Sequence, residues 1–128
     1  MPAGETDQDL AERWHDLMGR YHRTSCALDR ALSADHGITV SEFEVLRQLA
    51  AWEGGCVRMH ALAEHVHLTQ SALSRVVSHL EKEALVNRSL CEDDRRSVFV
   101  TITPAGLARY RQAEPTHRAI LREQELLD

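Results

Sequence analysis

The sequence predicts a mainly α-helical domain with one small β-hairpin, arranged as a winged helix-turn-helix core between two flanking helices. Three observations predict this fold class: apolar residues recur at helical spacing in five segments, a tight turn joins two of these helices, and a hairpin pattern follows them. The chain has 128 residues, of which 43% are hydrophobic and 27% charged. That length and composition fit one globular domain over residues 1–128, with its core at about 37–102.

Two amphipathic helices are predicted in the first half of the chain. The first, at about 7–34, has an apolar stripe formed by Leu10, Trp14, Leu17, Tyr21, Leu28 and Leu32. Gly37 marks its end. The second helix is expected from Val40 to Ala51. Two capping boxes are available to start it, Thr39 with Glu42 or Ser41 with Glu44, and the sequence leaves both open.

A helix-turn-helix is predicted next. A short helix at Met59–Val66 and a turn at His65–Leu68 precede a longer helix with Thr69 as its N-cap. The inward side of this longer helix is expected to consist of Leu73, Val76, Val77 and Leu80.

The wing and the last helix complete the predicted fold. Two strands are expected at Val86–Leu90 and Val98–Ile102, and the polar segment Cys91–Arg96 is expected to be the turn between them. Thr103 and Pro104 form an N-cap and first-turn pair that starts a flanking helix at about 104–128. Pro115 is expected to kink or restart this helix.

Such an arrangement predicts DNA binding, because a helix fits the major groove of B-DNA and presents its first turns to the base edges. Gln suits adenine and Arg suits guanine, whereas Ser is better suited to phosphate. The candidate DNA contacts on the helix and wing are Thr69, Gln70, Ser71, Ser74, Arg75, Ser78, His79, Arg88, Asp94, Arg95 and Arg96. The alternatives are a solvated helix face, a turn of self-cancelling ion pairs, and an Arg88 that only holds the base of the hairpin.

The formal net charge of −5 does not exclude such a partner, because the excess acid is confined to one part of the chain. Residues 1–56 contain five basic and ten acidic residues, whereas residues 57–128 contain ten of each. Charges beyond a Debye length of about 8–10 Å are largely screened, so the second half can still present a locally basic surface.

Three stretches of the sequence resemble the MarR family of bacterial transcriptional regulators. The first begins at Gly37 as Gly-Ile-Thr-Val-Ser-Glu-Phe-Glu-Val-Leu-Arg-Gln-Leu. The second begins at Leu62 as Leu-Ala-Glu-His-Val-His-Leu-Thr-Gln-Ser-Ala-Leu-Ser-Arg-Val-Val-Ser-His-Leu-Glu. The third, Asp94-Arg-Arg-Ser-Val-Phe-Val-Thr-Ile-Thr-Pro-Ala-Gly, is the most specific.

The resemblance implies a homodimer joined through its first and last helices that binds a pseudo-palindromic operator, usually as a repressor. It also implies that an Arg96 oriented by Asp94 enters the minor groove. Two features differ from the family pattern. Ala84 stands where the family often has Gly, which suggests a different local turn, and the chain stops at Asp128, before a further expected helix. The sequence leaves open a shortened dimer interface or a missing tail.

The resemblance also implies a response to a ligand. Many such proteins release DNA when a small aromatic or phenolic compound, an antibiotic, an oxidant or a metal binds where the dimer helices meet the winged helix-turn-helix core. The candidate effector residues on the first helix are Arg13, Trp14, His15, Met18 and His22, which would suit an anionic aromatic compound. The alternative is that Trp14 and Met18 are core or dimer contacts.

Other function classes find less support. His60, His65 and His67 lie close together, but no acid or Cys partner accompanies them at zinc spacing. Cys26 suggests a peroxide sensor, although a buried structural thiol is expected there. A redox- or metal-sensing regulator of the same fold, and a winged helix used only for protein–protein assembly, remain the alternatives.

No enzyme and no cofactor are predicted, because no nucleophile–base pair, phosphate loop or metal triad is visible. The sequence shows no apolar run of membrane-spanning length, and Met1–Asp7 does not resemble a secretory signal. We therefore expect a cytoplasmic protein without a membrane partner.

Overall fold

The computed structural model describes residues 4, 6–52, 57–91 and 94–124, and for residues 91 and 94–97 it describes the backbone only. Helices form at α1 (Asp7–His36), α2 (Val40–Ala51), α3 (Met59–Val66), α4 (Gln70–Lys82) and α5 (Pro104–Glu123), and strands at β1 (Val57–Arg58), β2 (Val86–Cys91) and β3 (Asp94–Ile102). The predicted fold class, mainly helical with a small β-hairpin, is confirmed.

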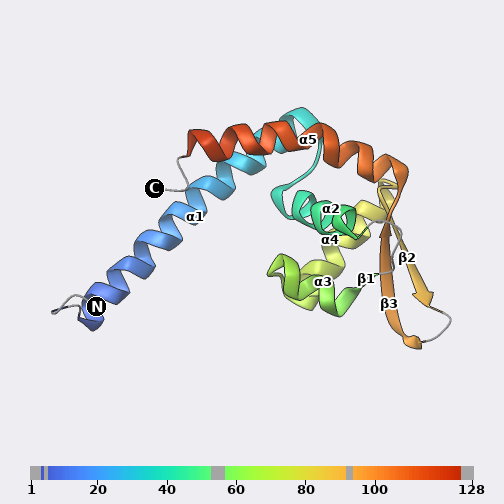
Figure 1. The fold of residues 1–128 in the computed structure, drawn as a ribbon, viewed down its shortest axis with the longest axis horizontal. Helices are drawn as coiled ribbons and strands as arrows, with labels where there is room; N and C mark the ends of the chain where they lie inside the picture. Colours follow the sequence, from blue (N-terminus) through green and yellow to red (C-terminus); the bar gives the residue numbers. More distant parts are fainter. Residues whose placement is uncertain (1–3, 5, 53–56, 92–93, 125–128) are drawn as a thin grey trace.

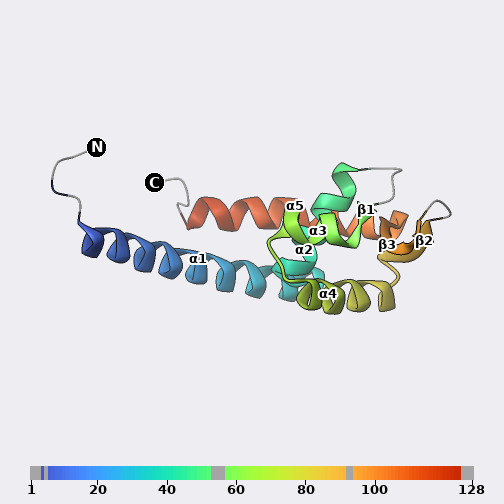
Figure 2. The same ribbon diagram turned by 90° about the horizontal axis from the view of Figure 1, so that it is seen from below.

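The two flanking helices and the helix-turn-helix core occupy different parts of the molecule. Helices α1 and α5 run side by side, while α2, α3, α4 and the sheet gather where α1 ends (Figure 1). The N-terminal part of α1 extends away from the rest of the chain in both views (Figures 1 and 2). Every residue from Asp7 to Arg23 except Gly19 is exposed. The first half of α1 therefore has an apolar stripe that no other described part of the chain covers.

Local capping explains where the core helices begin. The Thr39 side chain accepts the Glu42 amide at 3.1 Å and the Glu42 carboxylate accepts the Thr39 amide at 2.8 Å, so the first of the two predicted capping boxes is the one that forms. The hydroxyl of Thr69 accepts the Ala72 amide at 3.1 Å, which confirms it as the N-cap of α4. Gly37 ends α1 in the left-handed conformation, with φ 68°.

The sheet is larger than expected. Its strand order is β1-β3-β2, with both pairs antiparallel, and the sequence did not predict β1. Strands β2 and β3 also extend to Cys91 and Asp94, so the expected turn at Cys91–Arg96 is too long. Strands at the end of a hairpin pair through their backbones and need no apolar side chains. The charged residues there therefore gave no strand pattern in the sequence.

Helix α5 continues through Pro115 as one element, so the predicted restart is wrong. Proline deprives the carbonyl four residues earlier of its hydrogen-bond donor. Here that carbonyl belongs to Arg111, and both Arg111 and Pro115 are exposed. Water can therefore reach this carbonyl, which limits the cost of the proline.

A tight junction after α4 connects the helix to the wing and to α5. Ala84 has φ 61°, so the turn keeps the left-handed conformation despite the missing glycine. The expectation of a different turn is therefore wrong, and the alanine costs about 1 kcal/mol. The Leu85 amide donates to the Leu80 carbonyl at 2.9 Å, and the Thr103 hydroxyl donates to the Ala84 carbonyl at 2.8 Å. The bond from the Thr103 hydroxyl explains why a threonine stands directly after the last strand of the wing.

Gly106 allows α5 to approach the same junction. A Cβ atom at Gly106 would lie 2.0 Å from the Leu85 carbonyl oxygen and 2.9 Å from the Ile102 side chain. Because the first contact is with backbone, no side-chain rotation can relieve it. The Thr-Pro-Ala-Gly pattern is thus a packing requirement as well as a helix start.

His117 of α5 is a buried polar residue beside the core. Its ring stacks on Phe43 of α2 with 4.3 Å between the ring centroids, and Arg118 Nη1 lies 2.5 Å from its Nδ1 atom. Burial, followed by the positive charges of Arg118 and Arg47, lowers the pKa of His117 to about 4. The ring is therefore neutral at physiological pH.

We predict that Gly106→Ala lowers the free energy of unfolding by about 3 kcal/mol or prevents folding, because the added Cβ overlaps backbone at Leu85. Urea unfolding monitored by circular dichroism measures the loss. Gly19→Ala is the matched control: its Cβ would meet only the end of the Arg23 side chain, at 3.2 Å. The control should leave stability unchanged or raise it by about 0.5–1 kcal/mol. Equal effects of the two changes would contradict the packing role of Gly106.

A second prediction concerns acid stability. Between about pH 6.5 and 4 the unfolded chain protonates His117 whereas the folded chain does not, so acidification should lower the free energy of unfolding by up to about 3 kcal/mol through this residue. His117→Phe keeps a ring against Phe43 but cannot titrate. Urea unfolding across this pH range should give a shallower acid loss for the variant, and identical pH slopes would show that His117 is not buried as a neutral ring.

Candidate nucleic-acid interface

Helix α4 is fixed to the core by one side and presents the other to solvent. Leu73, Val77 and Leu80 are fully buried, whereas Gln70, Ser71 and Arg75 are exposed. The preceding turn places α4 against α3 through His67, which has φ 58°, and through the Leu68 amide, which donates to the Ala63 carbonyl at 3.1 Å. The predicted reading residues at the start of α4 therefore lie on its free side.

The start of α4, the start of α3 and the wing together border a hollow of about 800 Å³, lined by Arg58, Met59, His60, Ala61, Gln70, Ser71, Ser74, Arg88 and Val98. The side chains of Gln70 and His60 are hydrogen bonded, with 3.2 Å between Nε2 and Nδ1. The structure thus brings four of the predicted DNA contacts, Gln70, Ser71, Ser74 and Arg88, to one hollow, and their contact with DNA stays a prediction. It adds Arg58 and His60, which helical periodicity alone does not single out because they precede or begin a short helix.

Arg88 of β2 connects the wing to α4. Its Nη2 atom donates to the Ser78 hydroxyl at 3.0 Å and to the Ser74 carbonyl at 3.3 Å. Its Nε atom is buried and has no hydrogen-bond partner among the described residues. These contacts match the alternative in which Arg88 holds the base of the hairpin, and they leave its role toward DNA a prediction.

His79 points toward α2. Its Nδ1 atom contacts the Glu42 carboxylate, which is buried with its side chain 5% exposed. The hydrogen bond to Glu42 and the negative charge of Glu42 raise the pKa of His79. His79 was predicted to contact DNA, but its ring is engaged within the protein.

The tip of the wing carries the other predicted DNA contacts. The backbone of Asp94, Arg95 and Arg96 belongs to β3, at the far end of the hairpin from the core (Figure 1). Their side chains lie outside the described part of the structure, so their contacts with DNA remain predictions.

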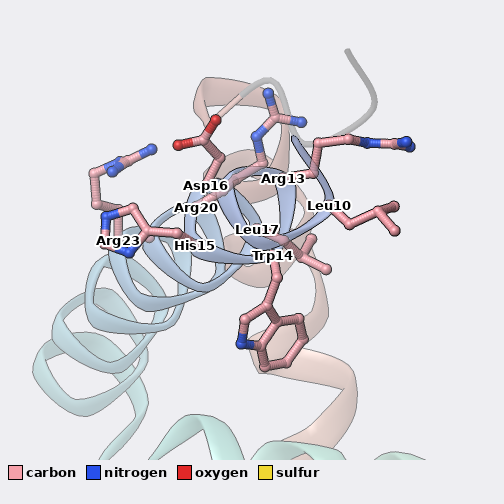
Figure 3. A pocket seen from close by; sticks show the side chains of 9 residues that line it. Leu10, Arg13, Trp14, His15, Asp16, Leu17, Arg20 and Arg23 are labelled. Atoms are coloured by element: carbon pink, nitrogen blue, oxygen red, sulfur yellow. The ribbon is translucent and has the colours of Figure 1, made fainter. Parts of the chain in front are cut away.

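The predicted effector residues lie on the free part of α1. Arg13, Trp14 and His15 line an open hollow whose side chains all come from this helix, and Trp14 points to the opposite side from Asp16 (Figure 3). Met18 and His22 are exposed but do not line this hollow. Among the described residues, only α1 lines this hollow, so the hollow is open to solvent.

A different cavity lies between the flanking helices and the core. It measures about 850 Å³ and is lined by residues of α1, α2, the end of α3, the turn before α4, and α5. Apolar side chains such as Leu28, Val66 and Leu121 share it with the guanidinium groups of Arg20, Arg47 and Arg118. Sequence reasoning missed these arginines because they come from three separate helices with no common spacing.

The candidates for holding a metal ion are the histidine, cysteine and carboxylate side chains in the described part of the chain. No group of three His, Cys, Asp or Glu side chains there could hold a metal ion. The ring of His65 instead packs edge-on against Trp52 at 5.4 Å. Cys26 is exposed, with its Sγ atom 3.7 Å from His22 Nε2, so the expectation of a buried thiol is wrong for the single chain. Among the described helices, none is both long and apolar enough to cross a membrane.

Comparison with known proteins places this geometry in a family. The family model described as MarR family matches residues 38–98. Curated relatives are HTH-type transcriptional regulators of Bacillus subtilis, 26% to 33% identical, and the matches span about three fifths of their length. Among solved structures, Sco3205 from Streptomyces coelicolor in complex with DNA is 29% identical, with 97% of this chain and 77% of that chain covered and a TM-score of 0.83.

Two further structures extend the comparison. BpsR of Bordetella bronchiseptica, whose DNA binding is regulated by 6-hydroxynicotinic acid, is 25% identical over 88% of this chain and 83% of its own, with a TM-score of 0.76. AbsC, a MarR family transcriptional regulator from Streptomyces coelicolor, is 31% identical over 93% of this chain and 79% of its own, with a TM-score of 0.80. The sequence matches and the shared winged-helix fold together show that the chain belongs to the MarR family.

Proposed function

We propose that this protein is a cytoplasmic, sequence-specific DNA-binding repressor that acts as a homodimer and releases its operator when a small anionic aromatic compound binds. The observation that carries the proposal is the free side of α4, where Gln70, Ser71 and Arg75 are exposed beside the wing. The likeness to Sco3205, solved in complex with DNA, supports the same use of the fold.

The chemistry of this side suits a duplex. The sequence from His65 to Leu80 contains no carboxylate that would repel phosphate. A glutamine amide pairs with adenine and a guanidinium with guanine through two hydrogen bonds, each worth about 1–3 kcal/mol of discrimination. We infer that Ser71 and Ser74 contact phosphate, which would fix the register of the helix without reading sequence.

A second copy of the chain is the proposed partner of α1. The free part of this helix exposes Leu10, Trp14, Leu17 and Tyr21, with exposed fractions of 50%, 60%, 57% and 71%. Most of the stability of a helix in a protein comes from the packing of its apolar face, so packing against another chain would stabilise this part of α1. Two chains joined this way carry two α4 helices, which matches a pseudo-palindromic site with half-sites about one helical turn apart.

The cavity between the flanking helices and the core is the proposed effector site. Its apolar walls suit an aromatic ring, and its guanidinium groups suit a carboxylate that would compete with the ion pairs of Arg47 with Glu44 at 3.5 Å and of Arg118 with Glu114 at 3.6 Å. Because the cavity is lined by α1, α5, α2, the end of α3 and the turn before α4, a bound compound would touch both the proposed dimerisation helices and the helix-turn-helix. The regulation of BpsR by 6-hydroxynicotinic acid, an aromatic acid, supports this class of ligand.

We predict that Arg75→Ala and Arg96→Ala weaken DNA binding in different ways. Loss of a base contact at Arg75 should lower affinity for the selected operator by about 1–3 kcal/mol with little effect on unrelated duplexes. Loss of a phosphate or groove contact at Arg96 should weaken binding to all duplexes and reduce the salt slope by about one. Gel shifts over a range of salt concentrations against the region upstream of the gene measure both effects.

The control for these two variants is Arg122→Ala, an exposed arginine near the end of α5, which should change neither quantity. Absence of any sequence-specific complex with the unmodified protein at every salt concentration would overturn the proposed function. An unchanged affinity in Arg96→Ala would remove the wing tip from the interface.

We further predict that 4-hydroxybenzoate, as a simple phenolic acid, raises the melting temperature and releases DNA, because it binds the folded protein in the cavity. Arg47→Gln should weaken this binding about tenfold, since it removes a charged partner of the carboxylate. Arg13 lines only the open hollow on α1, and Arg111 lines neither the hollow nor the cavity. The variants Arg13→Gln and Arg111→Gln should therefore bind 4-hydroxybenzoate as the unmodified protein does. Calorimetric titration compares the three variants, and a loss in Arg13→Gln alone would move the site to the hollow.

A further inference from the structure

Helix α4 and the start of α2 are joined by a buried acid and a titratable ring. The Glu42 side chain is 5% exposed and the His79 side chain 54% exposed, so the contact is closed on one side and open to solvent on the other. The Glu42 carboxylate also accepts a hydrogen bond from the Thr39 amide at 2.8 Å, which completes the cap of α2. Removing the charged partner of a buried carboxylate strongly destabilises the folded protein.

Few other charges bear on His79. On α4 itself, Glu83 Oε1 lies 3.9 Å from His79 Nε2, and Lys82 opposes protonation of the ring. From the wing, Arg88 binds the neighbouring Ser78 rather than the ring. The acid and base of α3, Glu64 and His60, pair with each other at 3.5 Å beside Gln70, near the opposite end of α4. Glu42 is therefore the dominant partner.

We propose that His79 is a positioning residue for DNA recognition: its protonated ring clamps α4 to Glu42, and operator binding weakens when the ring loses its proton. This inference rests on the proposed function. Nothing in the geometry requires the ring to touch DNA, because its Nδ1 atom is engaged on the α2 side of the helix. The clamp acts on the orientation of the helix that carries Gln70 and Arg75.

The direction of the pH dependence follows from the contact. Glu42 raises the pKa of His79 above its ordinary value, so the folded chain holds the proton to a higher pH than the unfolded chain does. The stability that the clamp contributes is thus fully present below the unfolded pKa of about 6.5 and is lost as pH rises through the folded pKa. Operator affinity should follow the same course, falling on the alkaline side.

The test measures operator affinity against pH by fluorescence anisotropy at constant salt, from about pH 5.5 to about 8.5, where histidine titrates. The probe is a duplex of about 30 base pairs, long enough for two half-sites and selected from a random library with the unmodified protein. The unmodified protein should lose about tenfold in affinity toward alkaline pH. His79→Arg should bind tightly at every pH, because a guanidinium keeps its charge beside Glu42. His79→Gln should bind about tenfold more weakly at every pH.

Glu42→Gln distinguishes positioning from direct contact. The amide oxygen can still cap α2, but the negative partner of His79 is gone. If His79 positions α4, this variant should weaken operator binding as His79→Gln does, and the double variant should be no worse than either. If His79 instead contacts phosphate directly, Glu42→Gln should leave binding intact, which would overturn the inference. Circular dichroism of each variant checks that it folds.

Two further outcomes separate this inference from the proposed function. His36→Gln is the control, because this histidine at the end of α1 is hydrogen bonded to Thr116 of α5 at 2.8 Å and not to α4, and it should keep the pH profile of the unmodified protein. A profile that persists in His79→Arg would also overturn the inference while leaving DNA binding established. If the unmodified protein selects no duplex at any pH, the proposed function fails. The contact of His79 with Glu42 is then tested by the free energy of unfolding measured against pH. In that case His79→Gln should reduce stability below about pH 6.5 more than above it, and an equal loss at all pH values would contradict the clamp.

Discussion

Helix α4, the wing formed by β2 and β3, and α5 meet at the short junction of Ala84 and Leu85. The placement of α4 depends on this junction. The Leu85 amide closes the end of α4, the Leu85 carbonyl accepts the Thr103 amide at 3.1 Å, and Gly106 lets α5 pack directly against that carbonyl. A left-handed residue is needed for this geometry, and an alanine supplies it at a cost of about 1 kcal/mol. The junction thereby fixes α4 relative to α5.

Two side-chain contacts hold α4 beyond this junction. Arg88 fastens it to the wing and His79 to α2, so the C-terminal half of α4 is occupied by contacts within the protein. Its first turns remain free to meet DNA. The start of α2 that carries Glu42 also contributes Val40 and Ser41 to the cavity. The cavity that we propose as the effector site is therefore connected to α4 through one turn of α2.

How much of this could be predicted from the sequence depends on the distance along the chain over which each feature is encoded. Thr39, Thr69 and Thr103 cap helices through bonds to residues three positions away, so the helix starts were predictable. Leu73, Val77 and Leu80 follow helical spacing, which revealed the buried side of α4. The contact of Glu42 with His79 joins residues 37 positions apart, and the cavity arginines come from three helices. No local pattern encodes such meetings, and β1 has only two residues, too few for a periodic signal.

We propose that two copies of α4 read adjacent major grooves of one operator. Hydroxyl-radical and methylation-protection footprinting on the region upstream of the gene tests this arrangement. We expect protection of two major-groove segments whose centres lie about 10 base pairs apart, flanked by minor-groove protection from the wings. Protection of one isolated half-site, or of backbone without any major-groove purine, would contradict it.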